Sequence, residues 1–138
     1  MVGALIVTHG RLAIELVNAA EMIVGEIHGI AAVSLGWHDD VDTATTMIRN
    51  ALDRVRTSDG VLILTDMFGG TPTNIASTFL AQENVEIITG VNLPMLIKLA
   101  QTQGEQVNEL ASVARMVRES GQNSIYRAGE LLAPKNPA

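Results

Sequence analysis

One stretch decides how this chain folds: residues 61–74, which read VLILTDMFGGTPTN. Its first five residues form a short apolar run, which predicts a strand buried on both faces. Asp66 to Gly70 then reads as a loop with two adjacent glycines. Threonine is a favoured N-cap and proline a favoured first helical residue, so a helix is expected to begin at Thr71-Pro72. Strand, loop and helix in this order are the repeating unit of an α/β sheet protein.

The same unit recurs on both sides of this stretch. Further apolar runs predict strands at residues 4–7, 30–35 and 85–88. Amphipathic periodicity predicts helices at residues 12–24, 43–56 and 94–101, and a long helix between Gly104 and Gly121. Alternation of strand and helix predicts one doubly wound, open and mainly parallel sheet of order 2-1-3-4, with helices on both faces. No internal repeat or second domain is visible.

The end of the chain reads differently. Residues 124–127 predict a last short strand, which needs a sheet edge to pair with because it is too short and isolated to form its own sheet. Residues 133–138 are rich in alanine and proline and predict a frayed end. We therefore expect one domain over residues 1–130 and a flexible tail over residues 131–138.

Composition excludes several classes of function. The chain of 138 residues has 47% hydrophobic and 3% aromatic residues, which suits a single domain with an aliphatic core. Its net charge is −6 and its nine basic residues are scattered, which argues against nucleic-acid binding. Cysteine is absent, which excludes disulfides and thiolate chemistry and fits a reducing cytosol. Neither a signal peptide nor a membrane span is recognisable, so a cytoplasmic location is expected.

Two residues at strand ends could carry chemistry. Ligands of open α/β sheets bind beyond the carboxyl ends of the strands, where His9 follows the first strand and Asp66 the third. In the order 2-1-3-4 these strands are neighbours. A neutral imidazole is a good nucleophile towards phosphorus when a carboxylate holds one ring nitrogen and the other is free. The pair therefore predicts His9 as nucleophile and Asp66 as the group that orients it.

Small residues near this pair predict a phosphate site. Gly10, Gly69 and Gly70 would let the backbone approach a ligand closely, and the Thr71 hydroxyl could join backbone N–H groups at a helix start in binding an anion. The stretch is not a P-loop, because the Lys-Ser/Thr pair is missing. A dinucleotide fingerprint and a nucleophile elbow are also missing from the sequence.

Three further features have a simpler interpretation. His28 is expected in a solvated loop. His38-Asp39-Asp40 contains metal-ligand residue types, but no second cluster completes a metal site. Trp37, the only tryptophan, is expected to pack within its loop, with contact to a partner protein as the alternative.

Three segments together resemble the IIA domain of the mannose-type sugar phosphotransferase system. They are Thr8-His9-Gly10, LTDMFGGTPTN at residues 64–74, and TGVNLPML at residues 89–96, and the resemblance covers about residues 1–130. It implies that His9 is phosphorylated, that Asp66 is its partner, and that the glycines and Thr71 line the site. It also implies phosphorylated HPr as donor, a IIB protein as acceptor, and no metal or organic cofactor. Members of this family are homodimers in which a C-terminal strand reaches into the partner's sheet.

Two departures from the family leave alternatives open. Arg11 stands where relatives often have an apolar or aromatic residue, so a cation lies near the incoming phosphoryl group. The chain stops where many relatives continue into a fused IIB domain, which favours a free-standing protein in sugar uptake or in a regulatory relay. The alternatives are a phosphotransfer subunit feeding dihydroxyacetone kinase, a non-catalytic sensor of an anionic metabolite and, less favoured, a hydrolase.

Overall fold

The four apolar runs of the sequence are the four strands of one parallel sheet. In the computed structural model, which describes residues 1–82 and 84–133, they are β1 (Gly3–His9), β2 (Ile30–Leu35), β3 (Val61–Thr65) and β4 (Val85–Thr89). The strand order is β2-β1-β3-β4 and every pairing is parallel, which confirms the predicted doubly wound sheet. β2 and β4 are therefore the edges.

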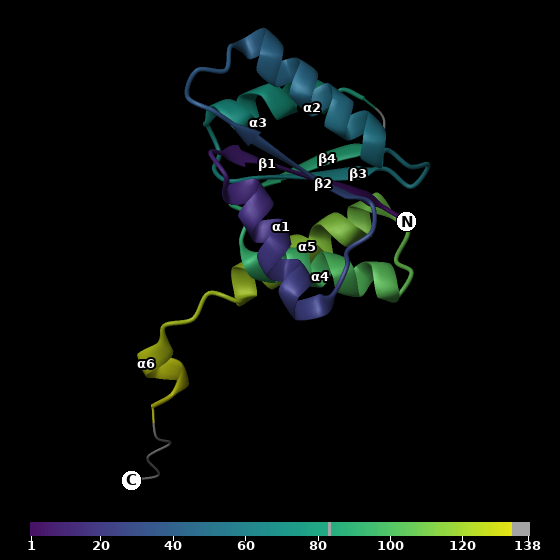
Figure 1. The fold of residues 1–138 in the computed structure, drawn as a ribbon. Helices are drawn as coiled ribbons and strands as arrows, with labels where there is room; N and C mark the ends of the chain where they lie inside the picture. Colours follow the sequence, from purple (N-terminus) through teal and green to yellow (C-terminus); the bar gives the residue numbers. More distant parts are fainter. Residues whose placement is uncertain (83, 134–138) are drawn as a thin grey trace.

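Helices cover both faces of the sheet (Figure 1). The described elements are α1 (Leu12–Val24), α2 (Val41–Val55), α3 (Thr71–Ala76), the 3₁₀ turn η1 (Ser77–Phe79), α4 (Leu93–Gly104), α5 (Leu110–Asn123) and α6 (Ala128–Leu131). One layer holds α2 and α3, and the other holds α1, α4 and α5. None of the helices in the described ranges is both long and apolar enough to cross a bilayer.

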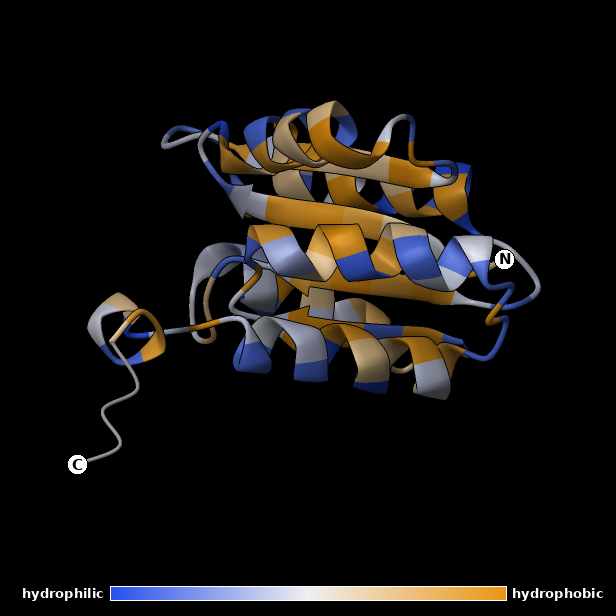
Figure 2. Ribbon diagram, turned by 90° about the horizontal axis from the view of Figure 1, so that it is seen from below, coloured by the Kyte–Doolittle hydropathy of each residue, from blue (hydrophilic) through white to orange (hydrophobic). Residues whose placement is uncertain are grey.

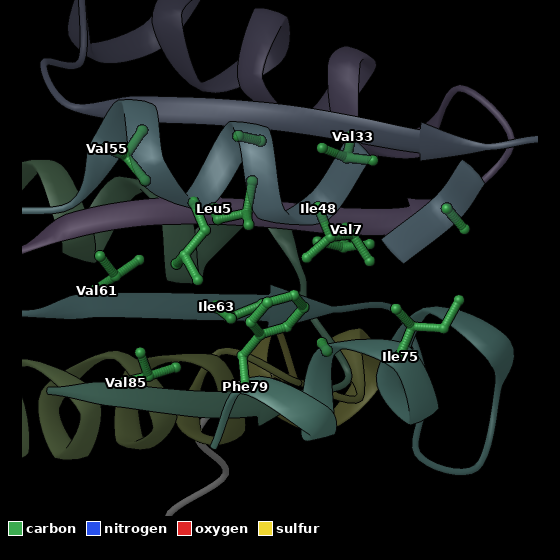
Figure 3. Close-up of a cluster of buried hydrophobic side chains, with 14 of the residues drawn as sticks. Leu5, Val7, Val33, Ile48, Val55, Val61, Ile63, Ile75, Phe79 and Val85 are labelled. Carbon is green, nitrogen blue, oxygen red and sulfur yellow. The ribbon is translucent and has the colours of Figure 1, made fainter. Parts of the chain in front are cut away.

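The sheet is buried on both faces because its strands alternate between two apolar clusters. Leu5 and Val7 point towards α2, where they meet Ile48 (Figure 3). Ala4 and Ile6 point to the opposite face. Figure 2 shows the same division, with predominantly apolar strands between helices that also carry polar residues. Burial of aliphatic side chains on both faces makes the central strands a rigid base for the loops at their ends.

The predicted helix boundaries need correction: α2 and α4 begin and end a few residues from the expected positions, and two further differences have a clear physical reason. Thr71 is the first residue of α3 and not its N-cap, because Gly70 occupies the cap position with extended backbone. The helix expected to stop at Gly121 continues to Asn123. Gly121 is buried inside α5, where an added Cβ would lie 2.6 Å from Cγ of Met95 in α4. This glycine permits close packing of two helices and does not end one.

The expected strand at residues 124–127 is not part of the sheet of this chain. Residues 125–127 have no regular structure and lead into α6, which points away from the domain (Figure 1). Ile125 and Tyr126 remain 76% and 64% exposed. A single strand has no hydrogen-bond partners of its own, so the segment is a strand only if it pairs with an edge elsewhere. Of the expected tail over residues 131–138, Leu131 ends α6, and residues 134–138 lie outside the described part.

Candidate functional site

His9 is the last residue of β1 and stands at the carboxyl edge of the sheet. Gly10 follows with φ of 55°, a left-handed conformation that turns the chain into α1. The buried hydroxyl of Thr8 accepts a hydrogen bond of 2.7 Å from the backbone N–H of Ala13. This bond ties the first turn of α1 to the end of the strand. The His9 side chain is 53% exposed, so a firmly held backbone presents an accessible ring.

Asp66 follows β3, the strand beside β1, and contacts His9 directly. Its Oδ2 atom lies 2.7 Å from His9 Nδ1 and accepts a second hydrogen bond of 2.9 Å from the His9 backbone N–H. Its Oδ1 atom accepts from the backbone N–H of Met67 at 2.9 Å. A carboxylate can only accept, so Nδ1 carries the proton and Nε2 keeps a free lone pair. The structure thus brings together the two residues that the sequence singled out.

The carboxyl of Asp66 is held in its charged form. Burial raises its pKa, since only 14% of the side chain is exposed. The hydrogen bonds from the His9 backbone and ring, the charge interaction with His9 and the bond from Met67 act in the opposite direction and outweigh burial. The pKa of Asp66 is therefore lowered, and the residue is a carboxylate at neutral pH.

The predicted phosphate-binding residues differ in how closely they approach His9. A Cβ added at Gly70 would lie 3.0 Å from His9 Cε1 and 3.6 Å from Nε2, so glycine keeps this side of the ring open. Gly10 and the exposed Thr71 border a pocket of about 390 Å³ together with His9. Gly69 does not line that pocket; with φ of 84° it turns the loop instead.

Buried hydroxyls, which the sequence reading missed, support the Asp66 loop. Thr73 donates a hydrogen bond of 2.6 Å to the carbonyl of Met67. The Thr65 hydroxyl lies 2.6 Å from that of Thr73 and donates to it, because the Thr73 proton is already engaged. In the sequence, this support could have been predicted only from Thr65, a polar residue at the end of an otherwise aliphatic strand. Its partner Thr73 becomes recognisable only when α3 packs back over the strand end.

The opposite wall of the pocket is the loop between β2 and α2. Trp37 lines the pocket but is fully exposed, so the expectation that it packs within its loop is wrong. The reason is a tight turn in which Asp39 Oδ2 accepts from the Gly36 N–H at 2.7 Å, leaving Trp37 at the tip. His28 and His38 are exposed. Among the residues that the structure describes, no group of three or more acidic or histidine side chains could hold a metal ion.

Comparisons with known sequences identify one family. The EIIA-man model, described as the PTS system fructose IIA component, matches residues 3–117. The mannose-specific EIIAB component of Escherichia coli K12 is 39% identical over 115 residues, 78% of this chain and 34% of that protein. The chain thus spans about one third of that relative. The fructose-specific EIIA component of Bacillus subtilis 168 is 34% identical over 100 residues, covering 72% of this chain and 68% of the relative.

Solved structures agree with this family. The PTS IIA protein associated with the fucose utilization operon of Streptococcus pneumoniae has a TM-score of 0.81 at 30% identity, with 94% of this chain and 95% of that chain covered. The mannose/sorbose specific IIA subunit of Enterococcus faecalis has a TM-score of 0.82 at 27% identity, covering 91% and 92%.

The hydrogen bonds to Asp66 predict a pH-dependent contribution to stability. Because the native pKa lies below the ordinary 3.8, ionised Asp66 stabilises the folded chain above that value, and the contribution disappears as pH falls through the native pKa. The difference in unfolding free energy between the parent and Asp66→Asn should shrink as pH falls below about 4. Urea unfolding at several pH values measures it. A difference that grows as pH falls from about 4 to about 2 would contradict the assignment.

Proposed function

The chain belongs to the EIIA-man family of the phosphotransferase system, and from this premise we infer that it is a phosphocarrier that accepts a phosphoryl group on Nε2 of His9. The observation that carries this proposal is the 2.7 Å contact between His9 Nδ1 and Asp66 Oδ2. It leaves the outer ring nitrogen unprotonated and directed away from the carboxylate. That arrangement suits an imidazole nucleophile.

The proposed phosphoryl transfer to His9 requires no proton to be added or removed. The Nε2 lone pair of His9 forms a new N–P bond while the N–P bond to the donor imidazole breaks, and the electrons of that bond return to the donor nitrogen. His9 keeps the proton on Nδ1, so its phosphorylated ring is positively charged. The Asp66 carboxylate, 2.7 Å away, stabilises this charge. Phosphoryl transfer depends mainly on positioning and electrostatics, which this pair supplies.

The small residues around His9 complete the proposed site. Gly70 leaves room beside Nε2, and Gly10 and Thr71 border the pocket that His9 also lines. Backbone N–H groups at the start of α3, which has no side-chain cap, and the Thr71 hydroxyl are suited to bind the phosphoryl oxygens. Gly69, with its positive φ, provides the turn within the loop between β3 and α3. Arg11 pairs only loosely with Glu15, at 3.7 Å, which leaves its cation available to an anion.

The partners follow from the family and are part of the proposal. Phosphorylated HPr is the donor and a IIB protein the acceptor, in the cytoplasm, for sugar uptake or for a regulatory relay. The relatives carry mannose, fructose and sorbose in their names, which gives no single substrate for this chain. No observation favours a kinase-feeding subunit or a metabolite sensor over this function.

Replacement of His9 tests the nucleophile. His9→Ala should abolish phosphoryl uptake from HPr, enzyme I and phosphoenolpyruvate, because the only free imidazole nitrogen of the site is lost. The fold should persist, since the side chain is half exposed. Intact-protein mass spectrometry detects an acid-labile gain of one phosphate. His28→Ala and His38→Ala are the matched controls, and uptake by His9→Ala at the parent rate would assign the phosphate elsewhere.

Replacement of Asp66 tests the orienting carboxylate while the proposed nucleophile, His9, is kept. Asp66→Asn keeps the shape but removes the charge that stabilises the phosphorylated ring. We expect phosphoryl uptake to slow by roughly 10- to 1,000-fold, less than the ~10⁴-fold loss for the orienting carboxylate of a serine-protease triad. Rapid-quench measurement with phosphorylated HPr gives the rate. Equal rates for variant and parent would reduce Asp66 to a turn residue.

The open edge of the sheet supports a homodimer. A groove of about 550 Å³ runs along β4 and is lined by both apolar and polar residues, among them Leu80, Ile87 and Gln122. The segment 124–127 beside it exposes Ile125 and Tyr126. Exchange of a short strand between two copies would pair the edge and cover these side chains. We therefore include in the proposal an exchanged antiparallel strand from residues 124–127.

Truncation tests this assembly. A chain ending at Asn123 keeps α5 whole but lacks the exchanged segment, so it should be monomeric or aggregate through the uncovered β4 edge. A chain ending at Ala133 retains the segment and should remain dimeric. Light scattering coupled to size exclusion gives the mass of each. A monodisperse monomer for the full chain at micromolar concentration would refute the exchange.

A further inference from the structure

Large apolar side chains are exposed on the loops that surround His9. Trp37 is 100% exposed, Phe68 is 82% exposed and Val41 is 65% exposed. Trp37 and Val41 lie on the β2–α2 side, and Phe68 lies in the β3–α3 loop. Because β1 lies between β2 and β3, these loops stand on opposite sides of His9. Exposed tryptophan and phenylalanine around a reactive group are typical of a protein-binding surface.

The turn that carries Trp37 is held at its base. Asp39 Oδ2 accepts from the Gly36 N–H at 2.7 Å, and the Asp39 N–H donates to the Gly36 carbonyl at 3.3 Å. Asp40 then caps α2 by accepting from the Thr43 N–H at 2.6 Å. Such a turn loses little conformational freedom when a partner binds. The backbone at Trp37 is thus held in place, while the indole itself has no packing role in its own domain.

Charges indicate the kind of partner. Asp39, Asp40 and Asp42 follow Trp37 directly, and all are exposed. The rim beside Trp37 is therefore acidic. Arg11 follows Gly10, outside this run, and pairs only loosely with Glu15 at 3.7 Å. A complementary protein has an apolar centre surrounded by basic side chains.

We propose that Trp37 is the main docking anchor for the phosphoryl donor protein, whose basic-rimmed apolar face covers the indole while its phosphohistidine enters the His9 pocket. This inference rests on the proposed phosphocarrier function. It adds a residue that takes no part in the chemistry but determines how well the donor protein is bound. Tryptophan is strongly enriched among the few residues that dominate binding energy at interfaces, as expected for an anchor.

The test compares a protein donor with a small one. The full-length chain, Trp37→Ala, Trp37→Phe and the control Leu132→Ala are phosphorylated by phosphorylated HPr and, separately, by phosphoramidate. Leu132 is 78% exposed and directly follows α6, which points away from the sheet (Figure 1). Phosphoramidate delivers the same phosphoryl group with loss of ammonia and offers no protein surface.

Trp37→Ala should lose on the order of 10- to 30-fold in kcat/KM with HPr, because KM rises, and should lose nothing with phosphoramidate. Trp37→Phe should recover part of the loss.

Each outcome distinguishes the docking role from the chemistry. An unchanged kcat/KM for Trp37→Ala with HPr overturns the proposal, as does an equal loss with both donors or an equal loss in Leu132→Ala. If the parent accepts phosphate from neither donor, the phosphocarrier function itself fails, and the docking role fails with it.

The indole also reports binding directly, because Trp37 is the only tryptophan in the chain. Titration of His9→Ala with unphosphorylated HPr should shift the fluorescence to shorter wavelength as the indole is covered, and added salt should weaken the shift. HPr binding that leaves the emission unchanged would place the interface elsewhere.

Discussion

The parallel pairing of β1 with β3 is the constraint on which the site depends. Val7 and Thr65 are paired in register, so His9, two residues after Val7, and Asp66, one residue after Thr65, both reach the carboxyl edge of neighbouring strands. Had another strand intervened, the loops would be separated by two strand spacings of about 4.8 Å each, beyond hydrogen-bond reach. The pairing is held by aliphatic residues buried on both faces, among them Ile6 and Ile63. Thus the core determines the distance between His9 and Asp66.

Hydrogen bonds of buried hydroxyl groups also restrain the loops that follow the strands. Thr8 holds the start of α1, and Thr73 holds the turn after Asp66. Both side chains are almost fully buried, and their bonds are satisfied within the chain. His9 therefore combines an exposed ring with a backbone that has little freedom. Under the proposed function, such a site needs no rearrangement before it reacts, which lowers the cost of positioning.

The sequence was informative where local pattern and tertiary environment agree. The strands were predictable because each is buried on both faces and reads as an apolar run, and the proximity of His9 and Asp66 follows once their order is known. Features that depend on distant contacts were not predictable. Gly121 looks like a helix end, but its neighbour Met95 is 26 residues away in the chain. The exposure of Trp37 depends on how Asp39 folds back, which a composition pattern does not reveal. Residues 124–127 have the β-propensity of a strand, but their own sheet offers no partner.

A single carboxylate oxygen, Oδ2 of Asp66, holds both the backbone N–H of His9 and its ring nitrogen. The imidazole is therefore fixed at two points, and its inner nitrogen cannot be offered to an electrophile without breaking the bond that orients the ring. Histidine has two phosphorylated isomers, and under the proposed function this geometry permits only the tele form, modified at the nitrogen farther from the main chain. The fold would then determine the regiochemistry of the product as well as the place where it forms.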